Sequence, residues 1–189
     1  MALDSESRWR LVRKAKAQPV EPVGETTIRA AVITDLGEIL DIYNFYVKNS
    51  AVTFDLEPMS LTEWREKFEW LGSLKMPFLV AVSPSGQLLG FAYVAPWRAK
   101  AAYRRTVEDS IYLRPAAIGK RVGTKLMQEL LTQAKAAGVR EVVAVISDRG
   151  ADASIQLHKS FGFKSQGHLA KVGFKFERWL GTVLLQKSL

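Results

Sequence analysis

The sequence contains no cysteine and only two histidines among its 189 residues. Without cysteine the chain cannot form disulfide bonds, thiolate nucleophiles or cysteine-based metal sites, and two histidines argue against a histidine-built metal centre. The chain also lacks an apolar run near the ~18 residues of a membrane-spanning helix, and no signal-like apolar segment follows its charged N-terminus. We therefore expect a cytoplasmic protein without a metal or a membrane partner, whose chemistry comes from other side chains.

Hydrophobic residues make up 48% of the chain, enough for one domain with a full core, and no internal repeat divides it. The formal net charge of +8 suggests an anionic partner, either nucleic acid or a polyanionic cofactor. The basic residues are scattered, and no helix-turn-helix or RNA-recognition signature is present. We therefore favour the cofactor and expect no nucleic-acid partner.

Residues 1–25 are rich in arginine and lysine, and prolines and a glycine follow the basic segment, so they are a poor source of core. This composition predicts a flexible basic extension, followed by one domain over residues 26–189. The arginines would also suit a mitochondrial presequence, but Asp4 and Glu6 argue against it because such leaders contain few acidic residues.

Hydrophobic periodicity and turn residues predict alternating strands and helices in the rest of the chain. The expected strands are residues 26–30, 78–82, 88–95, 107–113, 142–146, 163–169 and 173–185; the expected helices begin after Thr34 and Ser60, cover Leu126 to Ala134 and cover residues 154–161. We expect Thr34 to cap the first helix, and Ser60 with Glu63 to form a capping box at the second. About seven strands and four helices predict an α/β layered domain with a mixed, mostly antiparallel sheet.

The stretch from Val107 to Leu131 predicts a strand, a glycine-containing turn and a helix. The first N–H groups of such a helix have no partner within it, and Gly119 and Gly123 have no side chain to obstruct a ligand, so an anion can bind there. Two common nucleotide loops are excluded. Arg121 stands where a Walker loop needs serine or threonine, and the pattern G-x-G-x-x-G is absent.

The frame from Ile118 to Gly123 is similar to the loop [QR]-x-x-G-x-[GA] of the GCN5-related N-acetyltransferases, which binds the pyrophosphate of acetyl-coenzyme A. Only the last glycine matches, because Ile118 stands where the family has glutamine or arginine and Arg121 where it has glycine. Further segments, in the right order over residues 26–187, resemble the phosphinothricin and methionine-sulfone acetyltransferase branch. They are Ile28 to Ala30, Ile42 to Asn44, Pro96 to Arg98, Thr106 to Glu108, Ser154 to His158 with Gly162-Phe163, and Val172 to Phe176 with Arg178-Trp179. The resemblance implies the acetyltransferase fold of this family.

Amine acetylation from a thioester requires a base for the ammonium proton, donors for the developing oxyanion and an exit for the thiolate. In the resembled branch a glutamate stands at the position of Glu108, and we expect Glu108 to be this base. The alternative is a solvated carboxylate that pairs with Arg104 or Arg105. The acid that protonates the thiolate stays unassigned, with water and Tyr112 as candidates.

The resemblance also implies a binding site for acetyl-coenzyme A. Backbone groups of Ile111, Tyr112 and Leu113 are expected to hold its pantetheine arm, and Gly119, Lys120, Arg121, Val122, Gly123 and Thr124 its pyrophosphate. Arg121 adds charge but loses the conformational freedom of glycine. Ala151 stands where relatives place an asparagine that touches the cofactor, three residues before Ser154, and we expect both positions at the cofactor. The alternative is an ordinary connection with solvated basic residues.

The residues that the resemblance assigns to the acceptor are Phe54, Trp97, Arg98, Ala99, Lys100, Tyr103, Glu108, Asp109, Ser110, Lys175 and Arg178. Arginine suits a carboxylate or phosphinate because it donates two parallel hydrogen bonds. Lys175 and Arg178 could reach the acceptor across a homodimer. The alternative for these residues is a core tryptophan and solvated cations. Gly181 replaces an aspartate common in this branch, and His158, among apolar neighbours, is expected to be structural.

The sequence and the resemblance together predict an acetyl-coenzyme A dependent N-acetyltransferase that acts on the α-amino group of a small amino-acid-like molecule. Two alternatives stay open. The chain could be a non-catalytic acyl-coenzyme A binding or regulatory module whose loop has decayed, or it could acetylate a protein or peptide.

Overall fold

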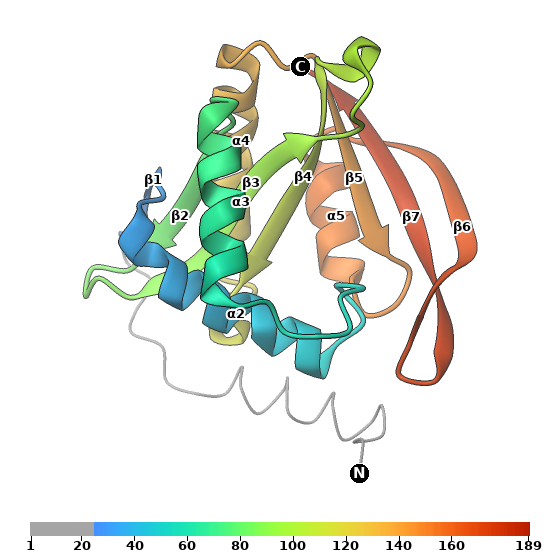
Figure 1. Cartoon of the computed structure of the whole chain (residues 1–189), viewed down its shortest axis with the longest axis horizontal. Coiled ribbons are helices and arrows are strands. Elements are labelled where there is room, and N and C mark those ends of the chain that lie inside the picture. The colour runs from blue at the N-terminus through green and yellow to red at the C-terminus, as the bar shows by residue number, and fades with distance from the viewer. Residues whose placement is uncertain (1–24) are drawn as a thin grey trace.

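A computed structural model of the chain describes residues 25–189, in which seven strands form one sheet (Figure 1). The strands are β1 (Thr27–Ala30), β2 (Phe78–Val82), β3 (Leu88–Pro96), β4 (Thr106–Leu113), β5 (Glu141–Ser147), β6 (Lys164–Lys175) and β7 (Arg178–Ser188). The helices are α2 (Leu36–Asn49), α3 (Leu61–Ser73), α4 (Val122–Ala136) and α5 (Asp152–Ser160), with short 3-10 turns η1 (Ile33–Asp35), η2 (Ala101–Tyr103) and η3 (Pro115–Ala117). The predicted mixed sheet of seven strands with four α-helices is confirmed for the described residues.

The strands lie in the order β1-β2-β3-β4-β5-β7-β6, and every neighbouring pair except β4 and β5 is antiparallel. The parallel pair is short, because Thr106 to Glu108 pair with Glu141 to Val143 and the register ends there. Beyond Glu108 each of the two strands continues without the other. The sheet therefore opens between β4 and β5.

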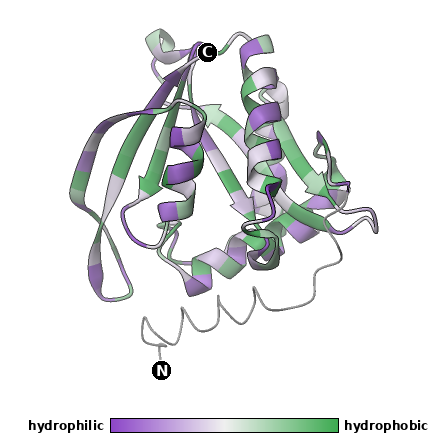
Figure 2. Cartoon of the chain, turned by 180° about the vertical axis from the view of Figure 1, so that it is seen from behind, coloured by the Kyte–Doolittle hydropathy of each residue, from purple (hydrophilic) through white to green (hydrophobic). Residues whose placement is uncertain are grey.

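Apolar residues pack on both faces of the sheet, because each helix turns one stripe of side chains toward it. On one face α4 contributes Val122, Leu126 and Leu130 to a core with β2 to β5, and on the other α2 and α3 surround the fully buried Trp64. Figure 2 shows that the central strands are mostly hydrophobic, whereas β6 at the edge of the sheet carries hydrophilic stretches. Within the described part of the chain, no helix is long and apolar enough to cross a membrane.

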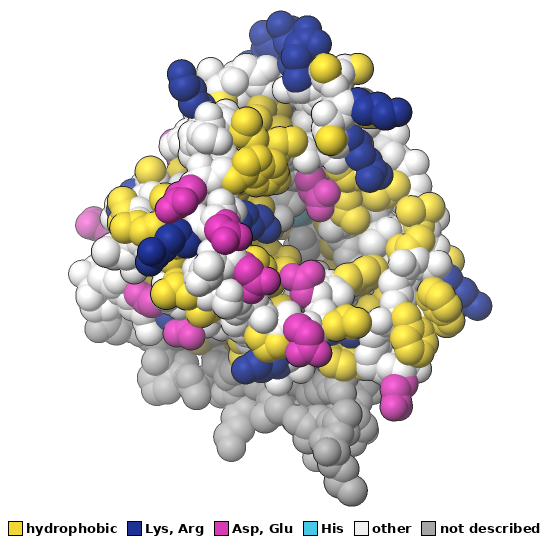
Figure 3. All heavy atoms as spheres, in the orientation of Figure 1, with side chains coloured by type: hydrophobic (Ala, Val, Ile, Leu, Met, Phe, Trp, Pro, Cys, Tyr) yellow, Lys and Arg dark blue, Asp and Glu magenta, His cyan; other side chains and the backbone are white. Residues whose placement is uncertain are grey.

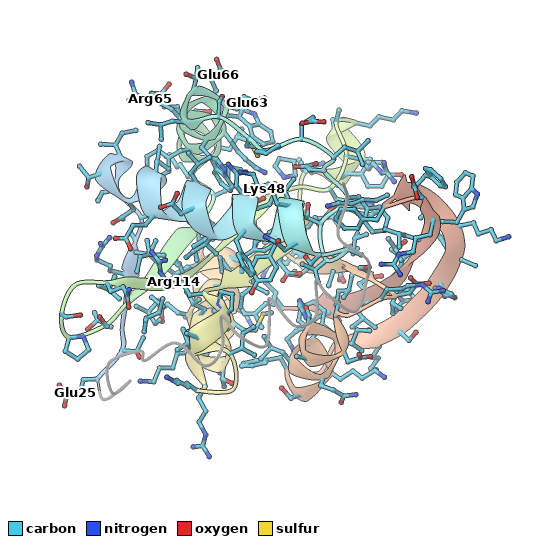
Figure 4. The ribbon with its side chains drawn as sticks, turned by 90° about the horizontal axis from the view of Figure 1, so that it is seen from below. Glu25, Lys48, Glu63, Arg65, Glu66 and Arg114 are labelled. Carbon is cyan, nitrogen blue, oxygen red and sulfur yellow. The ribbon has the colours of Figure 1, made fainter. Side chains whose placement is uncertain are left out.

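Polar contacts fix the ends of these elements. Ser60 accepts a hydrogen bond from the Glu63 N–H, and the Glu63 carboxylate accepts one from the Ser60 N–H at 2.6 Å, so the predicted capping box is confirmed. Arg114, which lies beside α2 in Figure 4, pairs with Glu38 at 2.7 Å and donates to the Leu88 carbonyl. This side chain joins the end of β4 to α2 and to β3.

The prediction that Thr34 caps the first helix is wrong, because Thr34 lies inside η1 and the N-cap of α2 is Asp35. The Asp35 carboxylate is engaged on the N-terminal side, where it accepts hydrogen bonds from the Val32 N–H and from Arg29. An acidic side chain at this position stabilises the turn that leads into the helix.

The prediction of a strand break between Leu169 and Gly173 is also wrong. The register of β6 against β7 shifts there, but the strand continues to Lys175, and the turn consists of Phe176 and Glu177. Both turn residues have positive φ, 54° and 60°, a conformation usually given to glycine or asparagine in two-residue hairpins. The sequence therefore carried no turn signal at this point. The extension predicted for residues 1–25 lies outside the described residues, apart from Glu25.

Gly90 on β3 provides a test of the β3–β4 register. A Cβ atom there would lie 2.7 Å from the Tyr112 carbonyl oxygen and would overlap the Leu113 side chain, whereas a Cβ on Gly37 in α2 meets none of the described residues within 4 Å. We expect Gly90→Ala to lower the free energy of unfolding by about 1–3 kcal/mol, and Gly37→Ala to raise it by about 0.5–1 kcal/mol. Urea denaturation followed by circular dichroism measures both, and a Gly90→Ala variant as stable as the parent would contradict the register.

Candidate active site

The opening between β4 and β5 is a cleft with a cavity of about 240 Å³. Its lining comes from β4, β5, α5 and the loop before α4, with Tyr46 and Val52 at the α2 side; it includes Glu108, Asp109, Ser110, Ile111, Tyr112, Leu113, Ile118, Ala144, Ile146, Gly150, Ala151, Ser154, Leu157 and His158. Figure 3 shows a hollow near the middle of this face, with acidic and apolar side chains around it. The predicted base and five of the predicted cofactor residues, Ile111, Tyr112, Leu113, Ala151 and Ser154, thus line one cavity, whereas the predicted pyrophosphate residues Gly119 to Thr124 are not part of its lining.

Glu108 and Asp109 stand where the cleft begins, and strand alternation sends their side chains to opposite faces of the sheet. Asp109 faces α5, where it contacts His158. Tyr112, on the same side of β4 as Glu108, packs against Tyr43 of α2 with ring centroids 5.1 Å apart. The Glu108 side chain therefore points toward α2 and α3.

The surroundings of Glu108 raise its pKa above the ordinary value. Burial is the largest cause because it disfavours the charged form, and the neighbouring charge of Asp109 adds to it. The positive charges of Lys67 and Arg98 act in the opposite direction. The alternative ion pairs with Arg104 or Arg105 do not occur among the described residues. A carboxylate with this environment can exchange a proton closer to neutral pH than a solvated one.

Lys67 and Tyr93 belong to this region but were not predicted from the sequence. The Lys67 ammonium donates to the Tyr93 hydroxyl at 2.7 Å and lies 4.6 Å from the centre of the Tyr93 ring. A signal was present, because Lys67 follows Trp64 by three residues and precedes Leu71 by four, and both of these are fully buried. A lysine inside the apolar stripe of a helix indicates that its ammonium group has a specific polar partner.

The loop before α4 has the backbone conformation that a glycine would ordinarily supply. Arg121 is the N-cap residue of α4 with φ 61° and ψ 9°, in the left-handed region, and Gly119 has φ 82°. Arg121 therefore adopts the glycine conformation despite its side chain, which is exposed together with that of Lys120. Among residues 25–189 no side chain caps α4, so the N–H groups at its start are available to an anion.

The first turn of α4 sits close to the cleft because of Gly123. A Cβ atom at this position would lie 3.4 Å from side-chain atoms of both Leu113 and Leu157, a tight contact. Val122 is buried beside it, and Thr124 is exposed. Ile118, where the acetyltransferase loop has a polar residue, lines the cavity with an apolar side chain.

The predicted pantetheine residues Ile111, Tyr112 and Leu113 lie on the part of β4 that has parted from β5. They pair with β3 on one side, and on the other the register with β5 ended at Glu108. The Leu113 carbonyl accepts a hydrogen bond from the Tyr46 hydroxyl at 2.6 Å. A strand edge without a partner can bind an extended ligand through its backbone groups.

Ala151 and Ser154 lie on the opposite wall, at the start of α5. Ala151 is the N-cap residue of this helix and is buried, and its carbonyl accepts from the Ser154 and Ile155 N–H groups. Both Ala151 and Ser154 line the cavity. Ala151 offers no side-chain hydrogen bond to a ligand or to the helix.

The predicted acceptor residues come from several segments. Arg98 follows β3 and stacks on Trp97, with its guanidinium carbon 4.6 Å from the ring centre. Ala99, Lys100 and Tyr103 are exposed around η2, and Ser110 lines the cavity. Phe54, between α2 and α3, packs against Gly173, where a Cβ would approach its ring within 2.6 Å. The loop that carries Phe54 is thereby held against the β6–β7 hairpin.

Lys175 and Arg178, on the same hairpin, are more enclosed than solvated cations would be. The Lys175 ammonium is buried and donates to the Thr53 carbonyl at 2.8 Å. Arg178 has a buried Nε atom without a hydrogen-bond partner among the described residues.

His158 is satisfied within the protein, as a structural histidine would be. It is 2% exposed, its Nε2 atom lies 2.9 Å from an Asp109 carboxylate oxygen, and its Nδ1 atom lies 2.7 Å from the Ser154 carbonyl oxygen. Asp109 is thus directed to the α5 wall and not to the side of Phe54 and Trp97.

At Gly181 a side chain would overlap the Asp148 carboxylate, which accepts a hydrogen bond from the Gly181 N–H. The carboxylate of Asp148, the residue after β5, thus occupies the space that a side chain at position 181 would need.

The domain is an α/β layered domain whose mixed sheet opens between two parallel strands. A half-buried carboxylate lies at this opening, and helix N–H groups lie beside it. Such a site suits an extended anionic ligand. The sequence profile of the acetyltransferase (GNAT) family matches residues 39–163. The chain belongs to this family, and it is an N-acetyltransferase.

Three similar proteins refine the comparison. Phosphinothricin N-acetyltransferase of Alcaligenes faecalis is 39% identical over 163 residues, which are 86% of this chain and 82% of the relative. L-methionine sulfoximine/L-methionine sulfone acetyltransferase of Pseudomonas aeruginosa is 38% identical over 86% of this chain and 94% of its own. The crystal structure of a phosphinothricin acetyltransferase from Sinorhizobium meliloti in complex with AcCoA has 41% identity and a TM-score of 0.83, covering 87% of this chain and 88% of that chain. The resemblance seen in the sequence is confirmed.

The left-handed conformation of Arg121 predicts a gain in stability on its replacement by glycine. We expect Arg121→Gly to raise the free energy of unfolding by about 0.5–1 kcal/mol, because it removes the clash of a Cβ atom in this region. Lys120→Gly is the control; its φ is not positive, so glycine only adds freedom to the unfolded chain and stability should fall. Chemical denaturation of both variants decides, and a destabilised Arg121→Gly would contradict the assigned conformation.

Proposed function

We propose that the protein transfers the acetyl group of acetyl-coenzyme A directly to the α-amino group of a small amino-acid-like acceptor, with Glu108 as the general base. One observation carries the proposal: Glu108 is half-buried, has a raised pKa and stands where β4 parts from β5. The relatives named above act, by their names, on phosphinothricin and on methionine sulfoximine or sulfone. This supports an acceptor of the same chemical class.

Acetyl-coenzyme A fits the cleft in two respects. The open edge of β4 offers backbone groups to the amides of the pantetheine arm, and the start of α4 offers free N–H groups to the pyrophosphate. The exposed side chains of Lys120 and Arg121 add positive charge beside those N–H groups. The structure of the Sinorhizobium meliloti relative with AcCoA supports this assignment.

The reaction then needs few steps from the protein. Glu108 takes a proton from the acceptor ammonium, directly or through one water, and the free amine attacks the thioester carbonyl carbon. A C–N bond forms, the C–S bond breaks, and the coenzyme A thiolate leaves and takes a proton from water or from Tyr112. A tyrosine already keeps its proton at neutral pH. Burial raises the pKa of Tyr112 further, which makes its hydroxyl a weaker acid and favours water as the proton source.

Arg98 is the best-placed group for the acceptor carboxylate. It is exposed, its charge acts on Glu108, and its stacking on Trp97 orients the guanidinium. Phe54 and Tyr103 would form apolar parts of the wall, with Ala99 and Lys100 between the arginine and Tyr103. Lys175 supports this wall from behind, through its bond to the Thr53 carbonyl.

A homodimer and a cytoplasmic location stay predictions. The homodimer has some support in the β6–β7 hairpin, where large apolar side chains stand in solvent, namely Leu169, Val172, Phe174 and Trp179. Exposed apolar residues gathered on one element often mark a protein contact.

The base assignment predicts the behaviour of Glu108→Gln. We expect this variant to bind acetyl-coenzyme A as the parent does but to turn over about 100-fold more slowly or worse, the usual loss for a positioned base. In the parent, kcat/KM should fall with decreasing pH through a pKa above the ~4.3 of an ordinary glutamate, because the base works only when deprotonated. Thiol release with a panel of amino-acid-like amines and short peptides measures turnover, and calorimetry measures binding.

Glu66→Gln is the matched control, because Figure 4 shows Glu66 on the outer side of α3, away from the cleft. It should leave both quantities unchanged. An unaltered rate in Glu108→Gln would remove Glu108 from the mechanism. Binding without turnover on any amine would favour the non-catalytic module, and turnover on peptides alone would favour a peptide acetyltransferase.

The loop predicts a second effect of Arg121→Gly, on affinity. Because the backbone already has the required conformation, glycine should add nothing to binding, and the loss of an exposed charge should weaken acetyl-coenzyme A by about two- to fivefold at low salt and less at high salt. Ala151→Asn should tighten binding by up to about tenfold by restoring one hydrogen bond. Titration at two salt concentrations measures both, and a tighter Arg121→Gly would mean that the loop has decayed.

A further inference from the structure

Each of the two histidines is paired with an aspartate, but in opposite environments. His168 and Asp148 meet at 3.0 Å with side chains 49% and 20% exposed, whereas His158 and Asp109 meet at 2.9 Å with side chains 2% and 1% exposed. A buried pair of this kind is costly unless its charges and protons match. The presence of such a pair at the cleft therefore suggests that it has a function there.

The hydrogen-bond partners of His158 determine how many protons the pair holds. The Ser154 carbonyl can only accept, so Nδ1 of His158 must carry a proton. Nε2 faces a carboxylate oxygen of Asp109, and a hydrogen bond there needs one proton, either on the ring or on the carboxyl group. In both cases the pair holds two protons, one on Nδ1 and one shared between Nε2 and Asp109, and has no net charge.

The pair also has a particular position. Asp109 directly follows Glu108, the last residue of β4 that pairs with β5. Among the described residues, the bond to His158 is the one side-chain hydrogen bond between β4 and α5. It therefore joins the two walls of the cleft where the strands part, and it lies next to the base.

We propose that Asp109 and His158 are positioning residues for acetyl transfer: they share one proton and hold α5 against β4 at the start of the cleft, and His158 offsets the charge that Asp109 places beside Glu108. The inference rests on the proposed role of Glu108. The charged groups that act on Glu108 from its neighbours are Lys67 of α3, Arg98 after β3 and Asp109 on β4 itself.

Two substitutions separate the charge effect from a merely structural one. His158→Gln keeps a donor for Asp109 but leaves the carboxylate negative, so the acidic limb of the kcat/KM profile should move up by about one pH unit. Asp109→Asn keeps the hydrogen bond, with the amide donating to neutral His158, and adds no charge, so the limb should not move up. The double variant carries no charge either, and its limb should return to the parent position. His168→Gln, the exposed counterpart, should leave the profile unchanged.

Nitrogen NMR of 15N-labelled histidine gives a readout that does not depend on activity. Nδ1 of His158 should carry a proton both in the parent and in Asp109→Asn, whereas the proton that Nε2 shares with Asp109 should be lost in Asp109→Asn. The direction agrees with the pKa of His158: burial lowers it, but the hydrogen bond and charge of Asp109 outweigh burial, and the net shift is upward. The stability that His158 contributes should therefore be complete below pH ~6.5 and decrease as the pH rises through the higher folded-state pKa.

The outcomes distinguish this inference from the proposed function. Full activity of Glu108→Gln would overturn the base and this inference together. Slow turnover of Glu108→Gln with an unshifted limb in His158→Gln would overturn the inference alone. A parent His158 whose Nδ1 carries no proton would also overturn it, and so would limbs that move up equally in His158→Gln and Asp109→Asn. Thermal melts confirm that each variant is folded.

Discussion

The site depends on one constraint, the early end of pairing between β4 and β5. Parallel strands in a sheet usually continue side by side, but here the register stops after three residue pairs, at Glu108 and Val143. The parting leaves backbone groups of β4 without a strand partner and creates the cavity, and it places a carboxylate where two walls meet. Burial at that point raises the pKa of Glu108, so the same feature forms the cleft and tunes the candidate base.

The loop before α4 shows that a motif can lose its residues and keep its shape. Arg121 holds a left-handed conformation that costs about 1–2 kcal/mol for a residue with a Cβ atom. The surrounding structure maintains it, since Gly119 turns the chain and Gly123 allows α4 to pack closely on Leu113 and Leu157. The substitution therefore changes charge and stability more than backbone geometry. A loop can thus keep the backbone shape of a motif although its residues no longer match the sequence pattern of that motif.

Much of the site could be predicted from the order of motifs, but several contacts could not. Lys67 acts on Glu108 although 41 residues separate them in the printed sequence, because the packing of α3 on β3 brings them together. The partner of His158 is likewise 49 residues away. Local patterns report spacing along one element, and they contain no information about which side chains meet across elements. The hairpin turn at Phe176 and Glu177 escaped prediction for another reason, because neither residue is typical of positive φ.

The sequence by itself determined the order of strands and helices, the capping box at Ser60, the family and the identity of the candidate base, because these depend on local periodicity and on motifs in a fixed order. The tertiary structure alone decided that Arg121 keeps the shape of a glycine, that Asp109 turns away from the acceptor side and pairs with His158, and that an Asp148 oxygen occupies the space next to Gly181. Each of these depends on the distance between segments that are far apart in the chain, and such distances exist only once the sheet has formed.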